Sequence, residues 1–363
     1  MRVGISKTLN ILLFLFLMVG GIEITLRIFW ANPYVLLFPD AYIHHPNLHR
    51  IFRHLDRVYE GAPDPVYFNT SSLGFIESRW TRELDRGNLY GAAFGGSTTE
   101  SATVQEDSRW TDLLSFPVLN YGLSRMTSVN NYLAMKHVLQ VQGMKPKIIF
   151  MMQGVNDVSA FLRHGVSFFD VDRYRPLIRN KGYDFIAKNV YSAAFLWRLW
   201  KQMDYHGFYA RESRKSRSYP VMTEEEFQSL IERMETPLLA ALQGVFNRMQ
   251  ILASSNEARL ILITEPDSFR SDYHPWRGDD LRAYPLHRGK RCSVEQAGRL
   301  MDLYRKIYLQ AATNLDLQFI DVAGCFQAVD VSPLIYDSVH LTERGSLFFA
   351  NCVEKALQAK KIP

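Results

Sequence analysis

One serine and one histidine in this sequence have neighbours that suit them to acyl-group chemistry. Ser97 follows two glycines in the stretch FGGST, and His340 ends the stretch DSVH, three residues after Asp337. A serine hydroxyl becomes a nucleophile when a neutral histidine takes its proton, and a carboxylate on the other imidazole nitrogen holds that histidine in the required tautomer. The sequence therefore predicts a catalytic group of Ser97, Asp337 and His340.

The tetrahedral intermediate of such a reaction also needs hydrogen-bond donors for its oxyanion. Backbone amides on tight turns and neutral carboxamides supply these donors without adding a competing nucleophile. Gly122 in NYGLS has no side chain and can bring its amide close, whereas Asn156 in QGVND can add a side-chain N–H. With the amide of Ser97 as the third donor, we expect Ser97, Gly122 and Asn156 to form an oxyanion hole. We interpret Asp157 as a loop or capping residue.

The elements that must position these residues follow from the order of apolar and helical segments after about residue 86. Five short apolar runs have the length of strands and occupy residues 89–96, 117–122, 145–154, 258–266 and 317–324. Helical segments begin near Thr98, cover 128–142, 224–254 and about 293–313, and follow Thr342 as a cap. This alternation is typical of parallel strands buried on both faces. It predicts an α/β fold, a three-layer sandwich with a parallel central sheet, whose functional residues gather at the carboxyl ends of the strands.

The motifs around these residues resemble those of a known family, the SGNH or GDSL-type hydrolases. The four residues that give the family its first name occur here in the family's order, as Ser97, Gly122, Asn156 and His340. The resemblance spans about residues 69 to 356, apart from an insertion. It implies a serine hydrolase that acts on ester bonds and requires neither a metal nor an organic cofactor.

The first motif departs from the usual pattern of that family. Gly96 stands where many members have aspartate, and Thr98 where many have leucine. This Gly-Gly-Ser-Thr block resembles that of membrane-anchored relatives, and the stretch NTSSLGF at 69–75 is similar to an NSLGFR stretch in the same relatives. The resemblance to this branch therefore implies attachment to a membrane.

The amino-terminal segment has the composition of a membrane anchor. Residues 9–22 carry no charge, and a helix from about Leu9 to Trp30 would be long enough to cross a bilayer, with Glu23 and Arg27 one turn apart near its far end. We favour an uncleaved anchor over a signal peptide, because no small-x-small cleavage site follows cleanly. Basic residues precede the helix, so the positive-inside rule predicts a cytoplasmic amino terminus and a periplasmic or extracellular remainder.

We therefore divide the chain into three parts. Residues 1–30 are the short cytoplasmic tail and transmembrane anchor, residues 31–85 are a stalk that leads into the domain, and residues 86–363 are the SGNH-like catalytic domain. An insertion at about 158–222 interrupts the alternating pattern of this domain. Its helical stretch at 193–203, rich in tryptophan and basic residues, packs on the domain or lies on a membrane surface, and the sequence leaves both placements open.

Composition limits the partners and cofactors. The formal net charge is +5, but the basic residues are scattered and the densest group, RESRKSRS at 211–218, is typical of a solvated loop. We therefore expect no nucleic-acid partner. His44, His45 and His49 lack the helical spacing and acidic partner of a metal site, and we interpret them as partly exposed loop histidines.

Three cysteines bound the disulfide chemistry of the chain. Cys292, Cys325 and Cys352 are widely spaced and match neither a disulfide scaffold nor a zinc-type pair. The sequence leaves open whether two of them form one disulfide. The odd number leaves at least one thiol unpaired within the monomer, as a small buried hydrophobe.

Three functional hypotheses follow from these features. The first is a membrane-anchored deacylase that acts on an O-acylated carbohydrate or lipid of the cell envelope. The second is an O-acyltransferase for an extracytoplasmic polysaccharide, with a multi-pass acyl-exporting protein as partner. The third is a non-catalytic polysaccharide-binding or assembly factor. The first two share an acyl-enzyme and differ in whether water or a substrate hydroxyl accepts the acyl group, so the sequence does not separate them.

Overall fold

The structure, a computed structural model, forms two compact units along the chain. One unit comprises Met1–Pro39 and Arg175–Phe208, and the other comprises Asp40–Tyr174 and Tyr209–Pro363. The residues that the structure describes are 14, 16–27, 43–44, 47–52, 59, 61–83, 90–172, 190, 192, 218–269 and 284–360.

In the first unit, residues 16–27 are helical. Glu23 and Arg27 form an ion pair of 3.0 Å within this helix, one turn apart. Ser192 donates two hydrogen bonds to Glu23, from its backbone nitrogen at 2.8 Å and its hydroxyl at 3.0 Å. No helix within the described residues is both long and apolar enough to cross a membrane. Residues 9–13, 15 and 28–30 of the predicted anchor lie outside the described residues.

Strands and helices alternate along the second unit. The strands are β1 (His49–Phe52), β2 (Val66–Asn69), β3 (Gly91–Phe94), β4 (Val118–Asn120), β5 (Ile148–Gln153), β6 (Arg259–Thr264), β7 (Leu286–His287), β8 (Lys290–Arg291) and β9 (Gln318–Ile320). The α-helices are α3 (Arg79–Glu83), α4 (Ser97–Glu100), α5 (Ser128–Lys136), α6 (Val155–His164), α10 (Glu224–Ser254), α11 (Val294–Asn314), α12 (Val322–Gln327) and α13 (Glu343–Ala359). A π-helical turn, η3 (His137–Val141), extends α5, and a 3-10 turn, η4 (Val166–Phe169), follows α6.

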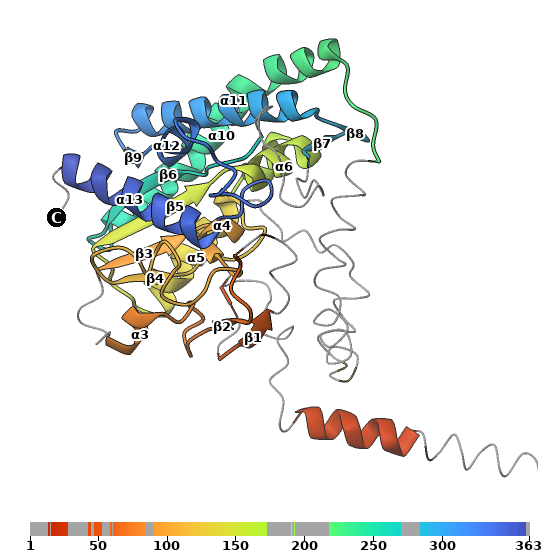
Figure 1. The fold of residues 1–363 in the computed structure, drawn as a ribbon, viewed down its shortest axis with the longest axis vertical. Helices are drawn as coiled ribbons and strands as arrows, with labels where there is room; N and C mark the ends of the chain where they lie inside the picture. Colours follow the sequence, from red (N-terminus) through yellow and green to blue (C-terminus); the bar gives the residue numbers. More distant parts are fainter. Residues whose placement is uncertain are drawn as a thin grey trace, which may run out of the picture. The chain divides into compact units, whose positions relative to one another are not determined.

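The centre of this unit is a parallel sheet. Its five strands lie in the order β4-β3-β5-β6-β9, and every neighbouring pair is parallel (Figure 1). All residues of β3, β4 and β5 are buried, which explains why these strands read as continuous apolar runs. The predicted α/β class and parallel central sheet are confirmed.

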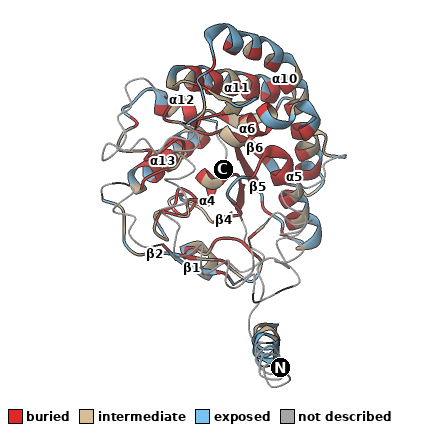
Figure 2. Cartoon of the chain, turned by 90° about the vertical axis from the view of Figure 1, so that its right-hand side faces the viewer, coloured by how far each residue is buried: buried red, intermediate tan, exposed pale blue. Residues whose placement is uncertain are grey.

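Side chains of successive strand residues enter two separate cores. Phe94, Ile149 and Leu262 belong to a core shared with α5, α10 and α11. Ala93, Phe150 and Ile263, each one residue away, belong to a second core with Trp110 and with α12 and α13. Figure 2 shows the buried sides of these helices turned towards the sheet. The period-2 alternation therefore produces three layers, with helices on both faces.

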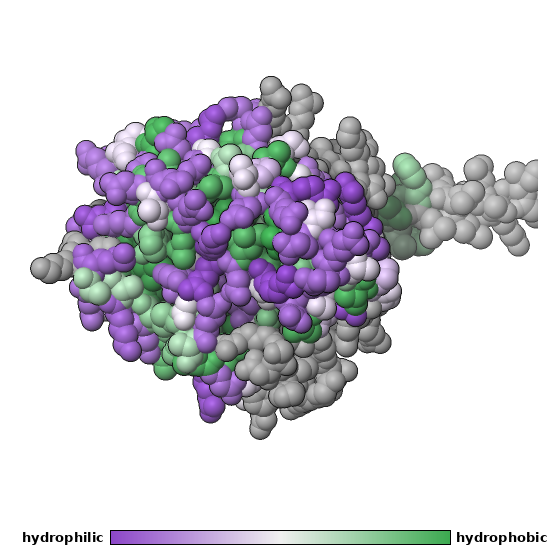
Figure 3. All heavy atoms as spheres, turned by 90° about the horizontal axis from the view of Figure 1, so that it is seen from above, coloured by the Kyte–Doolittle hydropathy of each residue, from purple (hydrophilic) through white to green (hydrophobic). Residues whose placement is uncertain are grey.

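The outward surface over α10 and α11 is polar. Figure 3 views the molecule from above, where α10 and α11 lie in Figure 1, and its surface is predominantly hydrophilic. Exposed ion pairs join these two helices, with Arg299 and Glu224 at 2.6 Å and Lys306 and Glu235 at 2.8 Å. Such exposed pairs contribute little free energy, so the two helices are held chiefly by their apolar contacts with each other and with the sheet.

The predicted element boundaries differ from the observed ones at three places. The helix expected near Thr98 is the single turn α4, because Ser101 has a left-handed backbone with φ of 48°. The last strand ends at Ile320, because Asp321 caps α12 by accepting a hydrogen bond from Gly324 N. Helix α6 runs through residue 158, where we expected the insertion to begin. Residues 173–189, 191 and 193–217 of that insertion, including the helical stretch at 193–203, lie outside the described residues.

Part of the interval predicted as a stalk packs into the second unit. Strands β1 and β2 form an antiparallel pair, and Val66 and Phe68 of β2 are fully buried. Ile76 extends the sheet beside β4, because its backbone nitrogen donates to Asn120 O at 2.8 Å. The alternating pattern did not reveal this contribution from residues before 86.

The histidines of this interval differ in exposure. His49 is exposed, as expected, but it lies in β1 and not in a loop. His44 is buried with only 3% of its surface accessible, so the prediction of a partly exposed residue is wrong for His44. His45 lies outside the described residues. No group of three or more His, Cys, Asp or Glu side chains within the described residues is arranged to hold a metal ion.

The cysteines form no disulfide. Cys292, Cys325 and Cys352 all carry free thiols. Cys292 is fully buried, and burial raises its pKa to about 12. Cys352 lies in the core between the sheet and α13, and Cys325 packs against the same core. The thiols therefore act as small core residues in this structure.

The cap of α13 allows a test of how the carboxyl-terminal helix is stabilised. Thr342 Oγ1 accepts a hydrogen bond from Gly345 N at 3.0 Å and donates one to Pro333 O at 2.8 Å. We expect Thr342→Ala to lower the free energy of unfolding by about 1–2 kcal/mol, because the buried N–H of Gly345 and the partly buried carbonyl of Pro333 both lose their hydrogen bond. Thr342→Ser keeps the hydroxyl and serves as the control in chemical denaturation. Equal losses in the two variants would contradict the capping role.

Candidate active site

The predicted site residues follow the carboxyl ends of neighbouring strands. Ser97 begins α4 after β3, Gly122 lies in the turn after β4, and Asn156 lies in the first turn of α6 after β5. Parallel strands that are neighbours end at the same edge of the sheet, so these three segments meet there. Asp337 and His340 lie on the loop between α12 and α13.

Close contacts bring Asn156 and the histidine loop to the segment around Ser97. A Cβ atom on Gly96 would lie 2.5 Å from Asn156 Nδ2, so the carboxamide lies directly against the turn that precedes Ser97. Thr98 Oγ1 lies 3.3 Å from Val339 O, in polar contact with the loop that carries His340. The residues on both sides of Ser97 therefore touch the loops that carry Asn156 and His340.

Gly122 packs even more tightly against α4. A Cβ atom at this position would lie 2.3 Å from Glu100 N, so only glycine fits without moving the backbone. The N–H of Gly122 donates to Asn120 Oδ1 at 2.8 Å, and Asn120 Nδ2 donates in turn to Thr99 O at 2.7 Å. The structure thus brings Gly122 to the site but gives its amide an internal acceptor, which the sequence did not indicate.

Asp337 and His340 form a directly bonded pair. Asp337 Oδ2 accepts a hydrogen bond from His340 Nδ1 at 2.5 Å, and Asp337 Oδ1 accepts from the backbone nitrogens of Val339 at 3.0 Å and His340 at 2.8 Å. Because the carboxylate accepts at Nδ1, we assign the neutral tautomer with Nε2 free of a proton. This is the tautomer that a general base requires.

The loop of this pair is fastened to the end of β6. Ser268 N donates to Ser338 O at 2.9 Å, and the hydroxyl of Ser268 donates to Asp337 O. Both Ser268 and Asp337 are buried. The position of the carboxylate is therefore fixed by the loop's own backbone and by the segment after β6.

The charges around His340 favour its protonated form. Burial alone lowers the pKa of His340, but the charge and hydrogen bond of Asp337, with smaller contributions from Glu265 and Glu100, raise this pKa above its ordinary value. His340 is therefore protonated over a wider pH range than a solvated histidine, and its Nε2 can accept a proton only above the raised pKa.

Two predicted oxyanion donors have no internal acceptor. No side chain caps α4, and the described residues offer no acceptor to the Ser97 N–H. The Asn156 carboxamide likewise makes no hydrogen bond to any part of the chain that the structure describes, although its Nδ2 lies against Gly96. Both groups can donate to a ligand beside Ser97. The Gly122 N–H already donates to Asn120 Oδ1, so it would have to share this hydrogen bond or break it in order to bind a ligand.

Glu265 is a site residue that the sequence analysis missed. This buried carboxyl follows β6 and accepts hydrogen bonds from Thr98 Oγ1 at 2.7 Å and from Val155 N at 2.7 Å. It therefore joins the residue after Ser97 to the residue before Asn156. Burial raises the pKa of Glu265. The feature of the sequence that could have identified Glu265 was its position at the carboxyl end of the apolar run at residues 258–266.

Asp157 has a structural environment of its own. It accepts hydrogen bonds from Ser128 N at 2.8 Å, Ser128 Oγ at 2.7 Å and Tyr304 OH at 2.8 Å. These bonds join α6 to α5 and α11, and burial raises the pKa of Asp157 to about 6. Its bonds therefore link helices rather than the segments around Ser97.

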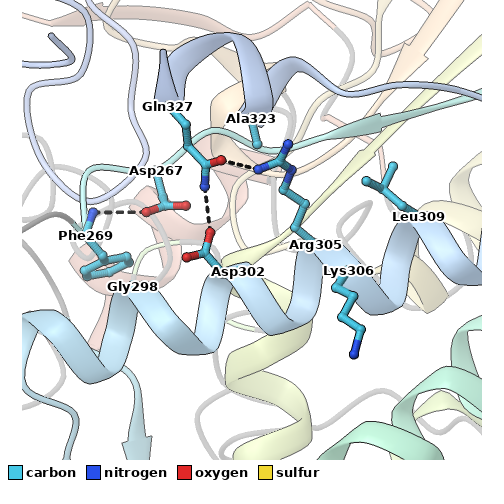
Figure 4. Close-up of a pocket in the computed structure, with 9 residues that line it drawn as sticks. All are labelled: Asp267, Phe269, Gly298, Asp302, Arg305, Lys306, Leu309, Ala323 and Gln327. Carbon is cyan, nitrogen blue, oxygen red and sulfur yellow. Dashed lines mark hydrogen bonds between the residues drawn. The ribbon is translucent and has the colours of Figure 1, made fainter. Parts of the chain in front are cut away.

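A separate cavity of about 680 Å³ lies beside α11 (Figure 4). It is lined by Asp267, Phe269, Gly298, Asp302, Arg305, Lys306, Leu309, Ala323 and Gln327. Gln327 bonds to both Asp302 and Arg305, and Arg305 also pairs with Asp321. Several of its polar side chains therefore bond to one another, and its lining includes none of the predicted catalytic residues.

Comparisons with known proteins find similarity among solved structures. No protein-family model and no curated protein matches the sequence. A lipolytic protein of the G-D-S-L family from Desulfitobacterium hafniense matches with 13% identity and a TM-score of 0.40, over 74% of this chain and all (100%) of that one. A carbohydrate acetylesterase from Sinorhizobium meliloti matches with 11% identity and a TM-score of 0.40, over 75% and 99%.

A third similar structure is a GDSL-like lipase from Bacteroides thetaiotaomicron. It matches with 15% identity and a TM-score of 0.37, over 78% of this chain and 98% of that one. All three identities are low, and the TM-scores lie at or below 0.40.

The Asp337–His340 pair predicts a measurable titration. NMR titration of the His340 imidazole should give a pKa above 6.5, and Asp337→Asn should lower it, because the anionic partner that favours the imidazolium is removed. Asp316→Asn removes an exposed carboxylate elsewhere and serves as the control. A wild-type pKa below 6.5, or equal values in wild type and Asp337→Asn, would contradict this account of the pair.

Proposed function

We propose that this chain is a serine esterase of the SGNH, or GDSL, type that forms an acyl-enzyme on Ser97. The observation that carries the proposal is the 2.5 Å hydrogen bond between Asp337 and His340, on a loop that contacts Thr98 beside Ser97. Such a pair supplies the base that a serine hydroxyl needs. The order of the four motifs along the chain agrees with this assignment.

In the proposed reaction, Ser97 Oγ attacks the carbonyl carbon of an ester while His340 Nε2 takes the hydroxyl proton. Asp337 stabilises the imidazolium that forms. The bond between the carbonyl carbon and the leaving oxygen then breaks, and His340 returns its proton to that oxygen. A second hydroxyl compound or water, activated by His340, attacks the acyl-enzyme and restores Ser97.

The oxyanion of each tetrahedral intermediate is held by Ser97 N–H and Asn156 Nδ2 in this proposal. Gly122 N–H is the third donor and is shared with Asn120 Oδ1, to which it donates at 2.8 Å. Removing one donor from such a site costs on the order of 2.7–4 kcal/mol of transition-state stabilisation. Because the Ser97 and Asn156 donors have no internal acceptor, we expect them to stabilise the oxyanion more than the Gly122 amide does.

The proposed substrate is an O-acylated carbohydrate or lipid of the cell envelope, with the active domain outside the cytoplasm. Transfer of the acyl group to a polysaccharide hydroxyl is the alternative outcome of the same acyl-enzyme. The two differ in the acceptor alone, so incubation of the acyl-enzyme with a soluble glycan distinguishes them: acetylated glycan supports transfer, and release of acetate supports hydrolysis.

The test of the proposed function is the fate of Ser97. Wild-type protein should react with a serine-directed phosphonate and turn over a chromogenic acetyl ester. Ser97→Ala should lose the adduct and at least about 10³-fold in kcat while remaining folded, because no nucleophile remains. Intact-mass measurement locates the adduct, and Ser255→Ala, an exposed serine distant in sequence, is the matched control.

Two results would overturn the assignment of Ser97. One is an adduct on a different residue, and the other is undiminished turnover by folded Ser97→Ala. His340→Ala should lose nearly as much activity as Ser97→Ala, and the double variant should lose little more, because both residues serve one proton-coupled attack. Additive losses would show that the two residues act separately.

The proposal includes a membrane anchor, supported by the uncharged run at residues 9–22. The full chain should fractionate with membranes, and protease added to the outer side should remove the domain but spare the short amino-terminal tail. A soluble mature chain that begins near residue 32 would show instead that the segment is cleaved.

A further inference from the structure

His44 reaches the candidate site from outside the alternating part of the chain. It precedes β1 and is buried, with its ring edge-on to Phe68 of β2 at a centroid distance of 5.2 Å. Its Nε2 donates a hydrogen bond of 2.8 Å to Gly122 O, across 78 positions of sequence. A carbonyl oxygen only accepts, so Nε2 carries the proton.

The imidazole of His44 is a neutral donor in this environment. Burial, together with the positive charges of Arg50 and Arg109, lowers the pKa of His44 to about 3. At physiological pH the ring is therefore uncharged, and its one N–H points to Gly122 O. The same Nε2 lies 3.5 Å from Glu100 Oε1, so the imidazole also touches the side chain that ends α4.

Glu100 contacts the same turn from the other side. It lies one helical turn after Ser97, is 2% exposed, and is hydrogen-bonded through Oε2 to Ser124 Oγ. Burial raises the pKa of Glu100, which favours an uncharged acid that needs no ionic partner. Its backbone nitrogen also lies 2.3 Å from the place that a Cβ atom of Gly122 would occupy.

We propose that His44 and Glu100 are positioning residues that hold the turn of residues 121–124 against the nucleophile helix α4. The inference rests on the function proposed above, because that turn supplies Gly122 and α4 supplies Ser97. His44 binds the turn at Gly122 O, and Glu100 binds it at Ser124. Neither side chain takes part in the proton transfers.

The position of Gly122 relative to Ser97 matters because the two residues lie on separate connections. The amides of Ser97 and Gly122 belong to different connections, one after β3 and one after β4. The distance between these two amides is therefore set by non-covalent contacts between the two connections. A displacement of about 1 Å in such a site can lower a rate by about 10²-fold. The hydrogen bonds of His44 and Glu100 fix that distance from one side of the turn.

Position 44 provides a test with a conservative rescue. In His44→Gln the side-chain amide can place an N–H where imidazole Nε2 lies, whereas His44→Leu has a similar volume and no donor. We expect His44→Leu to lose at least about 10-fold in kcat on a chromogenic acetyl ester with KM nearly unchanged. His44→Gln should stay within about threefold of wild type. Phe52→Leu changes a residue of β1 that packs on Phe68, as His44 does, and it controls for lost stability.

A second readout does not require activity. Amide hydrogen exchange of the peptide that covers residues 121–127 should be faster in His44→Leu than in wild type, His44→Gln or Phe52→Leu. If wild-type protein forms no phosphonate adduct, the proposed esterase function fails, and the exchange comparison still decides whether His44 holds the turn. Equal exchange in His44→Leu and wild type would overturn the positioning role, as would equal kcat losses in His44→Gln and His44→Leu.

Glu100 is tested by its neutral counterpart. Glu100→Gln keeps the length and the hydrogen-bonding capacity of the acid, so kcat measured above the acidic limb should stay within about threefold of wild type. Glu100→Leu should lose at least about 10-fold in kcat. Equal losses of kcat in Glu100→Gln and Glu100→Leu would show that the hydrogen bond between Glu100 and Ser124 does not position the turn, and would overturn the role of Glu100 as a positioning residue.

Discussion

The close approach of four chain segments around the single helical turn α4 is the constraint on which the site depends. The segments after β4, β5 and β6 and the loop before α13 all contact residues 96–100, and two of these contacts leave no space for a Cβ atom, at Gly96 and Gly122. Interiors packed this closely transmit small displacements rather than absorb them. The geometry around Ser97 is therefore set by the whole edge of the sheet.

Buried carboxyl groups hold the segments at this edge of the sheet together through hydrogen bonds. Glu265, Glu100 and Asp157 each join segments that are far apart in sequence, and burial raises the pKa of all three. Their hydrogen bonds satisfy backbone and hydroxyl donors that the crowded turns would otherwise leave without acceptors. Asp337 differs from them, because its partner is a titratable imidazole and its role is electrostatic as well as structural.

Local patterns predicted a large part of the fold and of the candidate site. Continuous apolar runs revealed the strands because both faces of the sheet are covered, and α10 at Glu224–Ser254 matched its predicted range because Thr223 forms a complete capping box. The motif residues Ser97, Gly122 and Asn156 were found because parallel strands end at one edge. Glu265 and His44 were not, because the residues to which they hydrogen-bond lie 78 to 167 positions away and no local spacing encodes such contacts.

The antiparallel pair of β1 and β2 changes the minimum length of chain that can form a complete site. A fragment that began at residue 86, where the alternation of strands and helices starts, would contain Ser97, Gly122, Asn156, Asp337 and His340. It would nevertheless lack the ring that binds Gly122 O, the buried side chains of Val66 and Phe68, and the backbone of Ile76 that pairs with Asn120. The unit that folds around Ser97 is thus larger than the sequence region that resembles a hydrolase core, and its amino-terminal boundary lies before His44.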